Sequence, residues 1–124
     1  MKEVCIVEFP SNLGLKEPQP GKEPGVKKLP NWLWKHNLHK AIQNKDIIRI
    51  DPLKYSNIRD NDTQILNANS LVGYAREQAY LINNLPTQNK FPLVLGGDCS
   101  ILLGNQYKRH FQFVQKINSI DHNS

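Results

Sequence analysis

The chain has 124 residues, of which 39% are hydrophobic and 22% charged; this is the size and composition of one ordinary globular domain and excludes collagen-like, low-complexity and coiled-coil proteins. We therefore expect a single domain over residues 1–124, and the lack of any apolar run of about 18 residues predicts no membrane-spanning segment. The formal net charge of +5 is mild but uneven, because five lysines and no acidic residue lie between Glu23 and Asp46.

The first strand and the long loop after it are clear in the sequence. Residues 4–9 (VCIVEF) are a short apolar run of β-forming residues that ends at a proline, which is typical of a buried strand. Cys5 lies in the middle of this run, so we expect it in the core. Residues 10–25 contain several prolines and glycines and predict a long loop, a kind of segment that is often functional in compact domains.

A helix and a second strand follow. The sequence that begins at Pro30 is typical of a helix start, and apolar residues continue at roughly helical spacing to Ile42. We expect at least one of Trp32 and Trp34 to pack under this helix. Residues 46–51 (DIIRID) predict the second strand, which a proline closes.

The acid-free, lysine-rich segment has two interpretations. Clustered lysines can bind nucleic acid or another polyanion. Arginines and interleaved exposed aromatic residues are missing from the pattern, however, so we expect an ordinary solvated helix face and no nucleic-acid partner. His36 and His39 lie three residues apart beside Lys35 and Lys40, which favours a surface position for both histidines.

The second half of the chain alternates helices and strands. A helix is expected after Asn69 or Ser70 as its cap, and residues 83–86 (NNLP) end it. Its expected inner face consists of Leu71, Tyr74, Ala75, Gln78 and Ile82. The later elements are a third strand over residues 91–95, a helix over residues 101–109 and a fourth strand over residues 111–120. Strands separated by helices indicate an α/β fold with a parallel sheet and helices on its faces.

The most informative local feature is the polar turn that directly follows the third strand. It consists of Gly96, Gly97, Asp98, Cys99 and Ser100. Ligand sites of parallel α/β sheets lie outside the carboxyl ends of the strands, so Asp98 and Cys99 are candidates for metal binding or hydrogen bonding. Glycines before a helix are also common in plain turns, and buried cysteines are usually inert. The residues alone therefore leave a functional site and a structural turn about equally open.

Two segments together resemble the N-terminal part of the ureohydrolase family, which includes arginase, agmatinase and formimidoylglutamase. Residues 93–100 (LVLGGDCS) resemble the family signature LGGDHS, and residues 24–26 (PGV), with the Pro and Leu residues after them, resemble the family's opening helix. The resemblance extends over residues 4–124. It implies a three-layer α/β/α fold with a parallel sheet, which would have about four strands here.

The resemblance also implies a chemistry. Members of the family hydrolyse guanidino or amidino C–N bonds of small molecules with two manganese ions, which convert a bridging water into the attacking hydroxide. The family's metal ligands are the histidine of GGDHS, a DAHxD segment after the next strand and a later DxD segment. We therefore expect a small amidine or guanidine as the substrate.

The match is incomplete at the metal ligands. Cys99 stands in the place of the first histidine, and a thiolate prefers softer metals such as zinc. Asp121 lies near the spacing of the first Asp of DAHxD, but the sequence after it (HNS) does not reproduce that motif. A one-residue slip of the alignment would place His122 at the position of the ligand histidine. Asp98 is expected to orient a neighbouring group rather than bind metal. No DxD segment follows, so we expect that this chain alone does not form the full manganese site.

Two functions stay open at this point. One is an arginase-type hydrolase, represented by its N-terminal part and weakly active or inactive alone. The other is a non-catalytic α/β remnant that acts as a binding or structural module. A short sheet would also leave an unpaired strand edge, which favours homo-oligomers. Because only two cysteines and no signal-peptide pattern occur, we expect reduced thiols and a cytoplasmic location.

Overall fold

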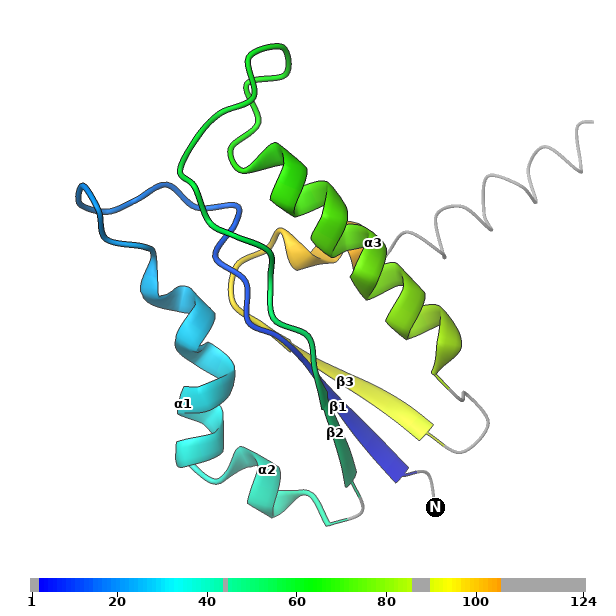
Figure 1. Ribbon diagram of the computed structural model, residues 1–124. Coiled ribbons are helices and arrows are strands. Elements are labelled where there is room, and N and C mark those ends of the chain that lie inside the picture. Colours follow the sequence, from blue (N-terminus) through cyan, green and yellow to red (C-terminus); the bar gives the residue numbers. More distant parts are fainter. Residues whose placement is uncertain (1–2, 44, 86–89, 106–124) are drawn as a thin grey trace, which may run out of the picture.

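A computed structural model describes residues 3–43, 45–85 and 90–105 (Figure 1). Within these ranges one parallel sheet has the strand order β2-β1-β3. Its strands are β1 (Glu3–Phe9), β2 (Lys45–Arg49) and β3 (Lys90–Gly96). The three strands expected here and the α/β class are therefore confirmed. The fourth expected strand, residues 111–120, lies outside the described residues.

The central strand β1 is the most buried element because its sequence is apolar on both faces. Val7 lies in register with Ile48 of β2 and Val94 of β3. Alternate side chains of a strand point to opposite faces, and both faces are covered here. Cys5 is only 1% exposed, which confirms its expected place in the core, and burial raises the pKa of its thiol.

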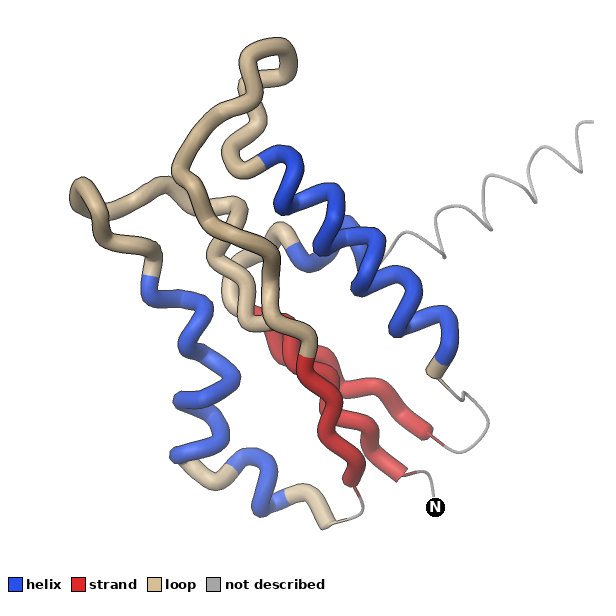
Figure 2. Tube along the Cα trace, in the orientation of Figure 1, coloured by secondary structure: helices blue, strands red, loops and turns tan. Residues whose placement is uncertain are grey.

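Helices cover both faces of the sheet and produce three layers (Figures 1 and 2). The helical elements are the 3₁₀ turn η1 (Gly25–Lys28), α1 (Leu29–Lys35), α2 (Leu38–Ala41) and α3 (Ala68–Asn84). On one face, Cys5, Val7 and Phe9 form the core cluster with Tyr74 of α3. On the other face, Glu8 of β1 contacts His39 of α2. No helix in the described part of the chain is long and apolar enough to cross a lipid bilayer.

The prediction of one continuous helix from Pro30 to Ile42 is wrong, because the structure has two helices there. Asn37 adopts a left-handed backbone with φ of 69°, a conformation that asparagine tolerates better than most residues, and it separates α1 from α2. The expectation that a tryptophan packs under this helix is also wrong. Trp32 and Trp34 are 54% and 55% exposed.

Helix α3 (Ala68–Asn84) ends where the sequence predicted but begins earlier than expected. Asn67, rather than Asn69 or Ser70, precedes the first turn with φ of 53°, and its side chain does not cap the helix. Its Oδ1 instead accepts the backbone N–H groups of Ser56 and Asn57 at 2.8 and 3.0 Å. The expected inner face is confirmed at its centre, where Tyr74 and Gln78 are buried. Tyr74 packs edge-on against Phe9 with a centroid distance of 6.0 Å, and burial raises the pKa of its hydroxyl.

Candidate functional site

The loops that follow β1 and β3 lie beside each other at the carboxyl edge of the sheet. The strands are parallel and Phe9 is in register with Gly96, so both strands deliver their loops to the same place. The backbone N–H of Asp98 donates to the carbonyl of Ser11 at 3.1 Å. We refer to residues 11–14 as the first loop and residues 96–100 as the glycine turn.

Asp98 joins the two segments through one carboxylate oxygen and holds the glycine turn together through the other. Oδ2 accepts the backbone N–H of Gly14 at 2.8 Å, and Oδ1 accepts the Ser100 hydroxyl at 2.9 Å. The Ser100 hydroxyl also lies 3.2 Å from that of Ser11. The carboxylate is only 9% exposed. Both carboxylate oxygens of Asp98 therefore accept hydrogen bonds from groups of the protein.

The glycine turn depends on the small size of two glycines. A Cβ atom on Gly97 would overlap the carbonyl oxygen of Ser11 and lie 2.9 Å from that of Val26. A Cβ atom on Gly14 would overlap the Asp98 carboxylate. Any larger residue would therefore force the loops apart. Gly97 of the sequence motif thus has a steric role here, because it lets the backbone approach the first loop and η1, whereas a Cβ atom on Gly96 would overlap the side chain of Ile101.

Cys99 is the exposed member of the glycine turn. Within residues 3–43, 45–85 and 90–105, no group of three or more His, Cys, Asp or Glu side chains is arranged to hold a metal ion. Asp121, the second ligand expected from the sequence, lies outside these ranges. Asp98 already uses both carboxylate oxygens, and a thiolate is a soft ligand. The described donor set by itself therefore does not fit a manganese centre.

The first loop was not identified by motif, although a general rule would have found it. Its side chains follow β1 at the carboxyl edge, as the glycine turn follows β3. Ser11 and Asn12 are fully buried, and the Asn12 amide donates to the carbonyl of Pro24 at 3.2 Å. Listing the polar residues after every predicted strand is enough to detect such a loop.

A buried pair of titratable side chains on the α2 face was also missed. Glu8 Oε2 lies 3.1 Å from His39 Nε2, and these side chains are 7% and 3% exposed. Arg49 Nη1 lies 4.0 Å from the other oxygen of Glu8. The expected surface position of His39 is therefore wrong, whereas His36 is exposed as expected. Among the described residues, His39 Nδ1 has no hydrogen-bond partner.

Comparisons with known proteins show that this chain is similar to solved structures at the level of the fold. Neither the protein-family models nor the curated proteins give a match to this sequence. The structure of arginase from Bacillus caldovelox matches with a TM-score of 0.64 and 23% identity, over 84% of this chain and 35% of that one. Two structures of Bacillus subtilis arginase each match with a TM-score of 0.56, at 24% and 23% identity, over 83% and 87% of this chain.

These likenesses confirm, at the level of the fold, the resemblance that the sequence motifs indicate. The three-layer arrangement with a parallel sheet is that of part of the bacterial arginases. The chain spans about a third of the length of those proteins.

Proposed function

We propose that this chain forms part of an arginase-type hydrolase that acts on the guanidino or amidino C–N bond of a small molecule in the cytoplasm. The observation that carries the proposal is the glycine turn, which Asp98 fastens to the first loop at the carboxyl edge of an arginase-like sheet. This edge is where parallel α/β proteins bind their ligands. The glycine turn also contains the LGGDCS sequence that resembles the ureohydrolase signature.

Each residue of the glycine turn has a role in this proposal. Gly96 and Gly97 shape the turn, Asp98 and Ser100 hold it against the first loop, and Cys99 presents a thiol to solvent. Cys99 is the proposed metal ligand, with a preference for zinc over manganese. Asp121 is the second proposed ligand. The remaining ligands of a two-manganese centre would have to come from residues beyond these.

Metal analysis and an activity assay test the proposal directly. The purified chain is dialysed against manganese or zinc, its metal content is measured, and urea and ammonia release from arginine and agmatine is followed. We expect fewer than two ions per chain and little or no turnover, because the described residues hold no cluster of three donors. Bacillus subtilis arginase is the positive control.

Two outcomes would contradict this account in different ways. Two tightly bound manganese ions with turnover would show that the chain completes the site. If the chain binds neither metal, the glycine turn is not a metal-binding site, and this result favours the second candidate function.

That second candidate is a non-catalytic module that associates with a further copy of itself. It rests on the apolar side chains near β3: Phe91, Leu102 and Leu103 are 56%, 54% and 61% exposed. Within the described residues β3 pairs with β1 alone. Unpaired strand edges and exposed apolar side chains both favour association.

A further inference from the structure

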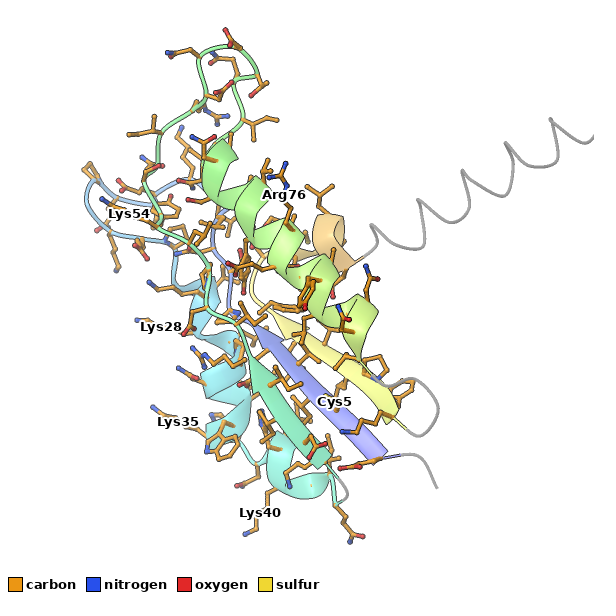
Figure 3. The ribbon with its side chains drawn as sticks, turned by 45° about the vertical axis from the view of Figure 1, so that its right-hand side comes forward. Cys5, Lys28, Lys35, Lys40, Lys54 and Arg76 are labelled. Carbon is orange, nitrogen blue, oxygen red and sulfur yellow. The ribbon has the colours of Figure 1, made fainter. Side chains whose placement is uncertain are left out.

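Much of the positive charge of the described residues lies on one side of the molecule (Figure 3). Residues 24–54 carry seven basic and two acidic residues, so a quarter of the chain accounts for the entire net charge of +5. Figure 3 shows Lys28, Lys35, Lys40 and Lys54 along the same side. These lysines come from η1, α1, α2 and the loop after β2.

The acidic residues of this side are already paired. Asp46 forms an ion pair with Lys90, which lowers the pKa of the aspartate, and Asp51 lies 3.0 Å from Arg49 Nε. Glu8 is buried against His39, and Glu23 pairs with Lys27. The exposed lysines on α1 and α2, by contrast, have no carboxylate within ion-pair distance in the described part of the chain. A ligand with negative charges therefore meets an uncompensated positive surface.

Two indole rings lie among these lysines. Lys28, Trp32 and Lys35 follow one another at spacings of four and three residues, which places them on one face of the helix. Trp32 stacks on His36 with a centroid distance of 3.9 Å and still leaves 54% of its surface exposed. The exposed aromatic residues that the sequence pattern lacked are thus present in the structure, and the expected plain solvated face has to be reconsidered.

The second indole forms a wall of a cleft. The cleft has a volume of about 320 Å³ and is lined by Trp34, Asn37, His39, Lys40 and Lys45. It combines a flat aromatic surface, an amide and two ammonium groups. His39 also contributes a buried ring nitrogen without a hydrogen-bond partner among the described residues. These groups match a nucleobase with its phosphate better than they match an apolar ligand.

We propose that the exposed surface of α1 and α2, called the α1–α2 face below, binds single-stranded nucleic acid. Because Trp32 and Trp34 are two residues apart on α1, this face has two sides. Lys28, Trp32 and Lys35 form one side, and Trp34, Lys40 and Lys45 line the cleft on the other. Unpaired bases stack on the two indoles and the phosphates lie on the lysines, which is the general mode of sequence-tolerant single-strand binding. A duplex buries its bases and offers the indoles nothing to stack on. Lysines bind phosphate as point charges and do not read base edges, so little sequence preference is expected. This proposal is independent of the hydrolase function.

Fluorescence anisotropy tests the proposal with the full chain and a labelled oligouridine of about 20 nucleotides. Binding through the four lysines of this face predicts a slope of about −3 in a plot of log affinity against log salt concentration. The double substitution Trp32→Ala with Trp34→Ala should weaken binding by about tenfold or more, the effect typical of losing base stacking. Lys35→Gln with Lys40→Gln should weaken binding and reduce the salt slope by about 1.

Matched controls lie on α3 in the opposite layer. Arg76 (Figure 3) and Tyr80 are both exposed, so Arg76→Gln and Tyr80→Ala remove a charge and an aromatic ring elsewhere and should leave binding unchanged. Circular dichroism verifies the fold of each variant. If the alanine variants do not fold, quenching of tryptophan fluorescence in the wild-type chain by oligouridine, but not by heparin, tests the stacking instead.

Several results would overturn the proposal. The first is a duplex RNA that binds as tightly as oligouridine. The second is an affinity for oligouridine that is unchanged in the tryptophan variants or is lowered as much by the α3 variants. The third is the absence of tryptophan quenching by oligouridine. A wild-type oligomer that becomes monomeric on loss of the tryptophans and does not bind oligouridine would assign this face to a second copy of the chain.

Discussion

Asp98 holds two separate segments together with one carboxylate. Its oxygens accept the Gly14 backbone N–H and the Ser100 hydroxyl, and its own backbone N–H donates to Ser11. Because the side chain is 9% exposed, water cannot easily replace these bonds. The position of Cys99, the next residue, therefore depends on Asp98.

The loss of this carboxylate should cost stability. Asp98→Ala removes the buried carboxylate that accepts the Gly14 N–H and the Ser100 hydroxyl, and we expect the free energy of unfolding to fall by about 1–3 kcal/mol. Asp98→Asn keeps one acceptor oxygen and should cost less. Asp62→Ala, at an exposed position, is the control. Urea denaturation measures all three, and an Asp98→Ala variant as stable as the control would show that the carboxylate does not fasten the glycine turn.

Single residues also mark the limit of sequence reasoning. The glycine turn could be predicted because it follows an apolar strand directly. The pair of Glu8 and His39 could not, because the two residues are 31 positions apart and meet only when α2 packs on β1. Glu8 lies in an apolar run, and His39 directly precedes Lys40. The local pattern therefore does not show that the two side chains become buried together.

At the scale of elements, strands were predicted better than helices. The apolar runs of β1, β2 and β3 are short and bounded by turn residues, and each strand ends within two residues of its expected end. The helix after Pro30 has no such boundary in its sequence. Its interruption depends on the left-handed backbone of Asn37, one of several conformations open to asparagine. Trp34 and Lys40 lie on either side of this break and line the same cleft, and this arrangement could not be predicted from the sequence either.

The exposed apolar surface near β3 leads to a prediction about self-association. A groove of about 400 Å³ between α3 and the segment after the glycine turn is lined largely by apolar side chains, including Val72, Ala79 and Leu103. We expect the wild-type chain to self-associate, and Leu102→Lys with Leu103→Lys to shift it toward monomer, because buried lysine charges are costly. Sedimentation velocity measures the change.

The control for self-association is Ile58→Lys, since Ile58 is 68% exposed on the loop between β2 and α3. This substitution should leave association unchanged. A wild-type chain that sediments as a monomer at all concentrations would contradict the prediction and remove the support for the second candidate function.

At the scale of the whole molecule, the proposed hydrolase site and the proposed nucleic-acid surface lie in different parts of the fold. The glycine turn and the first loop lie at the carboxyl edge of the sheet, whereas the basic α1–α2 face lies on the helical layer opposite α3 (Figures 1 and 3). The fold class and the parallel sheet followed from alternating strand and helix patterns. The arrangement of charge over the surface could not be predicted from these patterns, because it depends on how separate elements pack. The two proposals can therefore be tested and rejected independently.

The central claim is that the glycine turn is a metal-binding turn of the arginase type in which Cys99 replaces a histidine. Calorimetric titration of zinc and manganese into the wild type, Cys99→Ser and Cys99→His measures this most directly. We predict that the wild type prefers zinc, that Cys99→Ser loses zinc affinity, and that Cys99→His gains at least about tenfold in manganese affinity relative to zinc. Equal affinities in all three proteins would contradict the claim.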